Sequence, residues 1–298
     1  MNMSTIGRPA SSLAPYRAAV LDAPVSYSVY SAFSYFGARR GGELPGPWLV
    51  SALGALGHET GAIRQTLYRM ERSRELLSRS VGRMKLYRLT PFARAEAEAG
   101  LEKIMQEAPA EWDGQWTLVQ FQAGSEGRLE RERFREIARV EGFASTGAGL
   151  LIHPRDRSAR LLSAAAELGV RDVLEVFRCR RVHGEGDREF VARHWSLDDL
   201  ADRYRAFVAK YRRDAVSRLA RSADQAFLMR FAVVFEYLET AWDDPDLPLA
   251  LLPRSWPGPA ARALARRLYR SFLPGAIRFA DAVMARVSPS IQESPDDS

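Results

Sequence analysis

Residues 57–100 read GHETGAIRQTLYRMERSRELLSRSVGRMKLYRLTPFARAEAEAG, and this stretch decides the fold of the first third of the chain. Within it, Ile63, Leu67 and Met70 recur at spacings of four and three residues. That spacing predicts a helix over 60–73 with one buried apolar face. The charged and polar residues between them then lie on the exposed faces of the helix.

A β-hairpin and a further helix are predicted directly after this helix. Two short β-like runs, 76–81 and 86–89, flank the tight turn 82–85, which is Gly-Arg-Met-Lys. Thr90 is a suitable N-cap and Pro91 a suitable first residue for an alanine- and glutamate-rich helix. The hairpin is therefore expected to project between two helices.

Two more helices are predicted upstream. An apolar and aromatic helix over 25–38 is ended by Gly41-Gly42, and a second has Pro45 and Pro47 in its first turn and stops at Gly57. Helix, helix, turn, helix and a two-stranded wing is the order of a winged helix-turn-helix. In that motif the third helix enters the DNA major groove.

The distribution of charge supports the same interpretation. The chain has 298 residues, is 46% hydrophobic, and carries a formal net charge of +6. The window 58–94 contains nine basic and three acidic residues, and so carries an excess of +6 by itself. All but three of the basic residues of the chain are arginines. Their abundance alone is weak evidence of function, so their location along the chain is the more informative feature. A localised positive excess is expected where a surface faces a polyanion.

Eight residues are predicted to contact double-stranded DNA. Arg64 and Gln65 can bond guanine and adenine edges, whereas Thr60, as N-cap, would offer its hydroxyl and backbone N–H groups to a phosphate. The alternative is a merely solvated helix face, with Arg69 or Arg72 paired to Glu71, Glu75 or another domain. The full set is Thr60, Arg64, Gln65, Tyr68, Arg69, Arg72, Arg83 and Lys85.

The rest of the chain is predicted to form an α/β block followed by helices, which makes the fold class α+β. Strands and helices alternate between Trp112 and Arg181, and this order suggests a small ferredoxin-like domain. From Trp195 on, the pattern is mainly helical, with a proline-rich connector before two closing helices. The predicted parts are a disordered tail (1–22), a winged helix-turn-helix domain (23–108), a ferredoxin-like middle domain (109–182), a helical effector and dimerisation domain (183–287) and a disordered tail (288–298).

Catalysis and metal binding are not expected. Cys179 is the single cysteine, and the four histidines are scattered without metal-ligand spacing. No phosphate loop, nucleophile elbow or HExxH pattern is found, and the acidic cluster 198–202 suits the first turn of a helix. A metal-dependent nuclease, the enzyme alternative for the middle domain, needs a carboxylate at the end of its first strand. Here none occurs before Glu126.

The sequence resembles the PaaX family of bacterial repressors, which control phenylacetic acid catabolism and related aromatic pathways. The segments that carry the resemblance are GAIRQTLYRM (61–70), GRMKLYRLTPFARAEAEAG (82–100), GFASTGAGLLIHP (142–154) and DLPLALLPRSWPGPAARALARRLYRSFLPGAIRF (246–279). The resemblance extends over about 23–279, and the LPxxWPGxxA pattern within the last segment makes it specific. One departure is that the family tends to have a glycine and a bulky aromatic before the first wing strand, where this chain reads Arg74-Glu75-Leu76-Leu77.

The resemblance implies a homodimeric repressor that an aryl-CoA thioester, such as phenylacetyl-CoA, releases from operator DNA. The effector site itself is not identified. Tryptophans could hold an aryl group and arginines the CoA phosphates, but the same residues also suit core packing and a solvated strand end. They are Trp112, Trp116, Trp195, Trp256, Arg178, Arg180 and Arg181.

No cofactor and no membrane partner are expected. The single cysteine suits a reducing cytoplasm, and neither a signal-peptide block nor a run of about 18 apolar residues is present. The remaining alternative is a protein-interaction adaptor with a vestigial winged helix. The operator sequence, the regulated genes, the acyl group and any activating role are not determined by the sequence.

Overall fold

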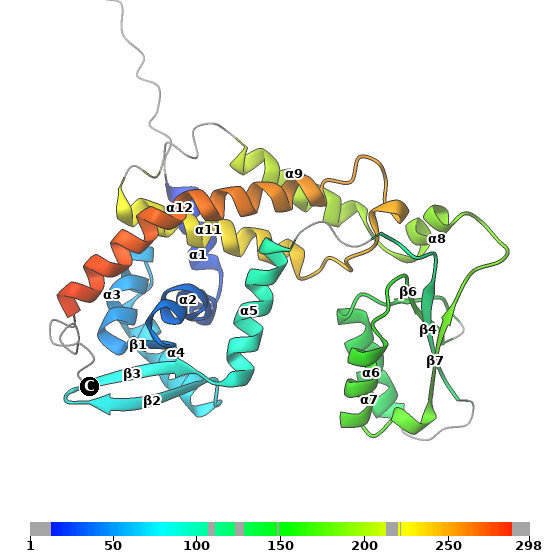
Figure 1. The fold of residues 1–298 in the computed structure, drawn as a ribbon, viewed down its shortest axis with the longest axis horizontal. Coiled ribbons are helices and arrows are strands. Elements are labelled where there is room, and N and C mark those ends of the chain that lie inside the picture. The colour runs from blue at the N-terminus through cyan, green and yellow to red at the C-terminus, as the bar shows by residue number, and fades with distance from the viewer. Residues whose placement is uncertain are drawn as a thin grey trace, which may run out of the picture. The chain divides into compact units, whose positions relative to one another are not determined.

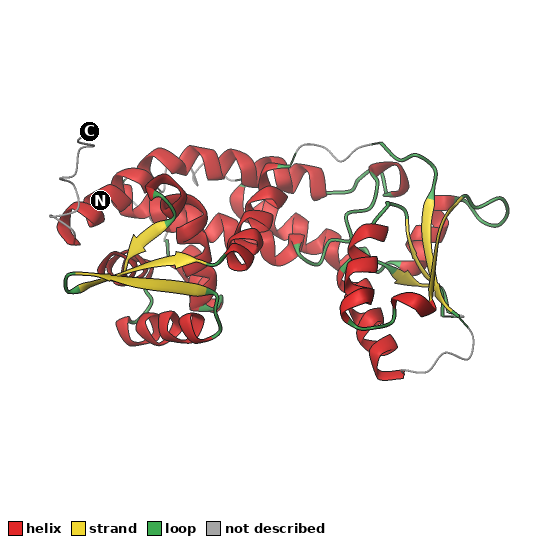
Figure 2. Cartoon of the chain, turned by 60° about the horizontal axis from the view of Figure 1, so that its bottom comes forward, coloured by secondary structure: helices red, strands yellow, loops and turns green. Residues whose placement is uncertain are grey.

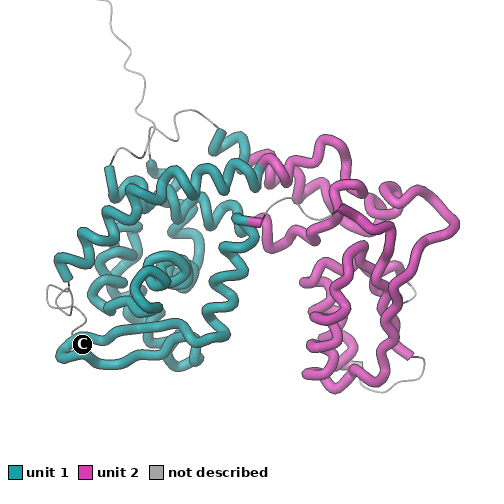
Figure 3. The backbone as a smooth tube through the Cα atoms, viewed as in Figure 1, with its two compact units in different colours: residues 1–105, 207–238, 261–298 teal, residues 106–206, 239–260 magenta. Residues whose placement is uncertain are grey.

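A computed structural model describes residues 13–106, 111–122, 128–147, 149–212, 220 and 222–287. Two compact units are present, each built from segments distant in sequence (Figure 3). Unit 1 comprises 1–105, 207–238 and 261–298, and unit 2 comprises 106–206 and 239–260. The mixed helix and sheet content agrees with the predicted α+β class. The predicted domain boundaries stay predictions.

Unit 1 is a helical body that carries one small antiparallel sheet (Figure 1). Part of α9 (Asp198–Tyr211), most of α11 (Ala223–Ala241) and most of α12 (Gly258–Val287) also belong to it. Its N-terminal elements are, in chain order, α1 (Ala14–Asp22), α2 (Val25–Ala32), a π-helix η1 (Phe33–Gly37), a 3₁₀ turn η2 (Ala38–Arg40), β1 (Glu43–Pro45), α3 (Gly46–Leu56), α4 (Thr60–Arg72), β2 (Leu76–Val81), β3 (Met84–Leu89) and α5 (Pro91–Met105).

The predicted hairpin is present and has a two-residue loop. Strands β2 and β3 pair from Leu76↔Leu89 to Val81↔Met84, so that Gly82 and Arg83 form the loop. Gly82 adopts a φ of +58°, a left-handed conformation that such tight loops require and glycine adopts readily. Sequence reasoning missed the third strand, β1, which pairs with β3 and contains Pro45. The expectation that Pro45 lies in the first helical turn was therefore wrong, because α3 begins one residue later.

Two further expectations were wrong. Part of the supposed N-terminal tail, Ala14–Asp22, forms α1, with Tyr16 and Val20 buried. The two closing helices are one helix, α12, with Pro274 inside it. Buried residues lie on both sides of this proline, Phe272 before it and Ala276 after it, so packing extends past the lost backbone donor. The predicted tail 288–298 lies outside the described residues.

The N-terminal helices of unit 1 share a core with α11 and α12. The ring of Phe36 lies 5.7 Å from that of Trp48 and 5.5 Å from that of Phe227, and Phe227 in turn lies 4.7 Å from Phe279. The indole N–H of Trp48, which is fully buried in α3, donates to the backbone carbonyl of Ala280 in α12 at 2.9 Å. The segment that the sequence predicts to be a helix-turn-helix therefore shares its core with α11 and α12.

Unit 2 contains a four-stranded antiparallel sheet in the order β5-β6-β4-β7. Helices α6 and α7 cover one of its faces (Figures 1 and 2), with Val119, Phe134 and Leu161 packed between the layers. The elements are β4 (Trp116–Phe121), α6 (Arg128–Val140), β5 (Ala144–Ser145), β6 (Leu151–His153), α7 (Ser158–Glu167), a 3₁₀ turn η3 (Arg171–Val173), β7 (Leu174–Cys179), α8 (Asp187–His194) and a 3₁₀ turn η4 (Leu249–Leu251).

The second hydrophobic cluster of unit 2 joins the sheet to later segments of the chain. Trp116 and Ile152 of the sheet pack with Trp195 and with Leu247 and Leu251 from the proline-rich connector. The connector is therefore part of the folded core of unit 2.

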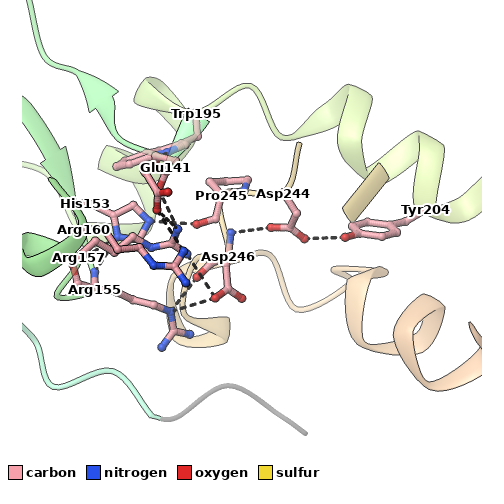
Figure 4. A network of polar contacts seen from close by, with 11 residues as sticks. Glu141, His153, Arg155, Arg157, Arg160, Trp195, Tyr204, Asp244, Pro245 and Asp246 are labelled. Atoms are coloured by element: carbon pink, nitrogen blue, oxygen red, sulfur yellow. Dashed lines mark hydrogen bonds and ion pairs between the residues drawn. The ribbon is translucent and has the colours of Figure 1, made fainter. Parts of the chain in front are cut away.

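A polar network fixes the connector to the sheet (Figure 4). His153 is fully buried, and its Nδ1 accepts from the backbone N–H of Arg155 at 3.0 Å. The proton therefore lies on Nε2, which donates to the carbonyl of Pro245 at 3.0 Å. Arg157 donates to the carbonyl of Glu141 at 2.9 Å and lies 3.5 Å from the carboxylate of Asp246.

Gly142 lies under the same connector and must be glycine. Its φ is +87°, and a Cβ atom there would lie 2.9 Å from the Cα of Pro245. Its carbonyl accepts the indole N–H of Trp195 at 2.8 Å. The close approach of Pro245 to the backbone of Gly142 explains why the GFASTG segment begins with glycine.

Acid is expected to destabilise unit 2 through His153. Burial, reinforced by the nearby Arg157 cation, lowers the pKa of His153 from 6.5 to about 3. Because only the unfolded chain takes up this proton, the stability contributed by the neutral ring is lost as pH falls below about 6.5. Between pH 7 and pH 5 the free energy of unfolding should fall by about 2 kcal/mol.

Urea titrations at several pH values measure this loss. A His153→Gln variant retains one donor and one acceptor and should show a flatter profile than the wild-type chain. His183→Gln, at an exposed position, is the matched control and should leave the profile unchanged. Equal slopes for wild type and His153→Gln would contradict the assignment.

Candidate nucleic-acid interface

The turn between α3 and α4 is short and anchored. Helix α3 ends at Leu56, Gly57 adopts a φ of +112°, and α4 begins at Thr60. Between them His58 is 8% exposed, and its Nε2 lies 2.8 Å from the hydroxyl of Ser28 in α2. Burial lowers the pKa of His58, so the neutral ring is favoured. This contact holds the turn against α2, and sequence reasoning did not identify it.

The predicted faces of α4 are confirmed. Ile63, Leu67 and Met70 are buried, and the predicted contact residues of this helix all lie on the solvent side. The exposed residues are Thr60, Arg64, Gln65, Tyr68, Arg69 and Arg72. They form one continuous polar and basic surface along the helix.

Thr60 is the first residue of α4 rather than its N-cap. The N-cap position belongs to Glu59, and no side chain caps the helix there. The expectation of an N-capping hydroxyl was therefore wrong by one position, because the extended backbone conformation falls on Glu59. The uncapped N-terminal turn still has backbone N–H groups without helical acceptors, which is the feature that binds phosphates.

The arginines of α4 are not used in ion pairs within the described part of the chain. Arg69 donates to the hydroxyl of Thr66 at 3.2 Å, and the guanidinium of Arg72 lies 6.0 Å from the ring of Tyr68. For Arg64, Arg72 and Arg83, the described residues provide no carboxylate partner. The expected pairing of Arg69 or Arg72 with Glu71 or Glu75 is absent from the described residues, because Glu75 binds Tyr30 and Glu71 binds Ser78. A merely solvated face stays an alternative to DNA contact.

Glu71 joins α4 to the hairpin. Its carboxylate accepts from the hydroxyl of Ser78 in β2 and lies 3.1 Å from the ammonium of Lys85 in β3. The Ser78 hydrogen bond, followed by Lys85, lowers the pKa of Glu71, and Glu71 raises that of Lys85. The Glu71–Lys85 ion pair is partly exposed, so it contributes only about 0–1 kcal/mol to the free energy of unfolding. Its main effect is to orient the hairpin, and a DNA contact by Lys85 stays a prediction.

Arg83 lies at the tip of the hairpin, beside Gly82 in the two-residue loop. Its side chain is exposed there. The exposed tip position of Arg83 is compatible with the predicted phosphate contact, which stays a prediction.

The turn from α4 into the hairpin places Arg74 in a left-handed conformation, with a φ of +60°. The N–H of Arg74 bonds to the carbonyl of Glu71, and that of Glu75 to the carbonyl of Met70 at 2.8 Å. This pair of bonds is a Schellman motif, which usually has glycine at the left-handed position. This chain therefore places an arginine at the left-handed position of the turn, and the carboxylate of Glu75 accepts from Tyr30 at 2.7 Å.

Replacement of Arg74 by glycine is expected to stabilise the chain. A left-handed non-glycine residue costs about 1–2 kcal/mol, and the greater entropy of glycine in the unfolded chain offsets part of the gain. A net increase of about 0.5–1 kcal/mol in the free energy of unfolding should appear in urea titrations. Arg74→Ala removes the same guanidinium but keeps the strain, so a similar gain for that control would refute the backbone explanation.

The residues considered for an effector site are engaged in structure. Trp116 is fully buried, Trp195 is 8% exposed, and the Trp112 N–H donates to the carbonyls of Gln115 and Pro154 at 3.0 and 3.1 Å. The ring of Trp256 lies 6.1 Å from that of Tyr204. The aromatic side chains therefore serve as core packing.

The three arginines of this region also have partners. Arg178 binds Asp113 at 2.7 Å, Arg181 binds Asp187 at 2.8 Å, and Arg180 donates to the backbone carbonyl of Asp113 at 3.4 Å. They hold the end of β7 and the segment after it in place.

The described ranges, with their gaps, contain no group of three or more His, Cys, Asp or Glu side chains arranged to hold a metal ion. Glu126, the first carboxylate after β4, lies outside the described residues. Of the described helices, none is long and apolar enough to cross a membrane.

Comparison with known proteins identifies the class. The model of the PaaX protein central Cas2-like domain matches residues 109–191, and that of the PaaX-like protein C-terminal domain matches residues 195–282. The transcriptional repressor PaaX of Escherichia coli (strain K12) is 27% identical over 268 residues, which cover 86% of this chain and 82% of the repressor. The uncharacterised protein Rv0674 of Mycobacterium tuberculosis has a similar fold, with a TM-score of 0.58 at 18% identity, over 88% of this chain and 98% of that one.

These matches define a transcriptional regulator rather than an enzyme. The two family models together span most of the chain from residue 109 to residue 282, and the relative extends the likeness beyond them. The chain belongs to the PaaX family.

Proposed function

We propose that the chain represses transcription by binding operator DNA through a winged helix-turn-helix formed by α3, α4 and the β2–β3 hairpin. The observation that carries the proposal is the exposed face of α4, where arginines without carboxylate partners in the described chain lie beside a tight, anchored turn. α4 would read bases in the major groove, and the hairpin tip would contact phosphates nearby.

The proposed assembly is a homodimer that places two α4 helices in successive major grooves of an inverted repeat. The regulated genes would belong to a phenylacetate-type aromatic pathway, as in the family, and the chain would act in the cytoplasm. In unit 2, the order of elements and strands matches a ferredoxin-like domain, for which we propose a dimerisation or ligand-sensing role.

The proposed effector is an aryl-CoA thioester such as phenylacetyl-CoA. It would release DNA by favouring a conformer in which the spacing of the two α4 helices no longer fits successive grooves. Such an effect requires different affinities of the thioester for the two conformers.

A gel-shift titration tests the whole proposal. Purified protein is added to the intergenic DNA upstream of its own gene, with and without a panel of aryl-CoA thioesters and with free CoA as the control. A shift reversed by one thioester supports both repression and ligand class. A shift that no thioester reverses refutes the effector, and no shift at low salt and micromolar protein favours an adaptor.

The roles of α4 and the hairpin can be separated by mutation. Arg64→Ala or Gln65→Ala should cost about 1–3 kcal/mol of affinity for the operator and relax sequence preference, because base contacts are lost. Arg83→Ala should weaken binding to all sequences about equally. Binding of each variant to the operator and to scrambled DNA measures the difference, and identical patterns for both kinds of variant would contradict the assignment.

A further inference from the structure

A buried cation without a carboxylate partner lies in unit 1. Arg230 of α11 is 2% exposed, and its Nη2 donates to the hydroxyl of Tyr269 in α12. Its Nε is buried and has no hydrogen-bond partner, and no ion pair within the described residues involves it. An uncompensated buried charge is costly, and arginine does not relieve the cost by losing its proton.

The surroundings of Arg230 are aromatic. Its guanidinium carbon lies 4.2 Å from the centre of the Tyr269 ring, 4.3 Å from that of Tyr35 and 5.5 Å from that of Phe36. Ring faces attract the cation but provide no acceptor for its N–H groups. The guanidinium thus keeps unused donors at its edge, and the orphaned Nε–H is among them.

The ring of Tyr35 belongs to an unusual backbone segment. Tyr35 and Phe36 lie in the π-helix η1, a form that is rare and frequently found at functional sites. Tyr35 is only partly buried, so that one side of the arginine environment extends toward solvent. Of the three rings around Arg230, that of Tyr35 is the most exposed, so a ligand would enter from its side.

We propose that Arg230 binds the carboxylate of a small organic acid, whose apolar part packs against Tyr35 and Tyr269. A planar carboxylate matches the guanidinium edge and supplies the acceptor that Nε lacks. Aromatic walls favour an aromatic or otherwise flat acid over a tetrahedral anion.

Occupation of this site would alter the packing of η1, because Tyr35 is adjacent to Phe36. Phe36 contacts Trp48 of α3, the helix that precedes the turn to α4. Acid binding and DNA binding would then be linked, and this consequence, unlike the binding itself, rests on the proposed function.

Thermal unfolding of the full chain tests the site. Sodium benzoate and sodium acetate are the carboxylate probes, sodium phosphate is the tetrahedral anion, and sodium chloride matches the ionic strength. At about 10 mM, benzoate should raise the wild-type Tm by about 3 °C over chloride, and acetate and phosphate by less. Phosphate acting more strongly than both carboxylates, or no shift by any of the three, would overturn the proposal.

Variants assign the shift to Arg230. Arg230→Leu should abolish the benzoate shift. Its basal Tm is recorded alongside, because the change removes a buried charge without a carboxylate partner but also the hydrogen bond to Tyr269. Arg267→Leu, at an exposed position of α12, is the matched control and should keep the shift. Should Arg230→Leu fail to fold, Arg230→Lys retains the charge but loses the planar fork, and an undiminished benzoate shift in it would refute the assignment.

DNA binding is measured separately in the same variants. Benzoate should weaken operator binding of the wild type several-fold and leave Arg230→Leu unaffected. A wild-type chain that binds benzoate but no DNA would refute the proposed function while leaving the acid site in place. A chain that binds DNA but no benzoate would refute only the site.

Discussion

Replacement of Trp48 by alanine is expected to lower the free energy of unfolding of unit 1 by about 3–5 kcal/mol. The side chain is fully buried in α3, contacts the ring of Phe36, and donates its N–H to the carbonyl of Ala280. Truncation leaves a large cavity and an unsatisfied buried acceptor. Because α3 supports α4, operator binding should decline together with the folded fraction.

Trp48→Phe separates the two contributions. It keeps most of the ring volume and loses the hydrogen bond, so a smaller loss of about 1–2 kcal/mol is expected. Urea titration followed by circular dichroism measures both variants. A loss below 1 kcal/mol for Trp48→Ala would show that α3 is not held by this contact.

Arg157→Ala is expected to lower the free energy of unfolding of unit 2 by about 3 kcal/mol or more. The side chain is 19% exposed and lies between the carboxylates of Glu141 and Asp246, at 3.4 and 3.5 Å. Its removal leaves both carboxylates partly buried and without this cation, and the carbonyl of Glu141 loses a donor. The part of the connector around Asp246 should therefore detach from the sheet.

Arg160 provides the matched control for this change. It also contacts Glu141 at 3.4 Å, but its side chain is 75% exposed. Water screens such a pair, so Arg160→Ala should cost less than about 1 kcal/mol. Equal losses in the two variants would mean that burial of Arg157 does not determine its contribution.

Periodicity made the N-terminal third predictable. The stripe of Ile63, Leu67 and Met70 required one particular face of α4 to be buried, and the exposure of the residues predicted to contact DNA followed from it. The hairpin followed from Gly82, because a two-residue loop between β-like runs has few alternatives. These features depend on residues close together in sequence.

The missed features depend on partners distant in sequence. Strand β1 is three residues long and exists because β3 pairs with it, which its own composition does not indicate. The bond between His58 and Ser28 joins positions thirty residues apart, and the engagement of Lys85 by Glu71 required the hairpin to fold back on α4. The isolated cation at Arg230 is apparent only once three segments are assembled around it.

The packing of α3 against α12 also limits which rearrangements of this chain evolution can use. A domain with its own hydrophobic core can fold alone and can therefore be joined to a new neighbour. In this chain Phe36 and Trp48 obtain part of their packing from Phe227 and Ala280, more than 170 residues later. A recombination event that joined residues 1–105 to a different sensor would expose these aromatic rings to water. If α4 reads the operator as proposed, changes in operator choice are expected to arise by point substitution on its outer face, while α3 and α4 are inherited together with the C-terminal helices.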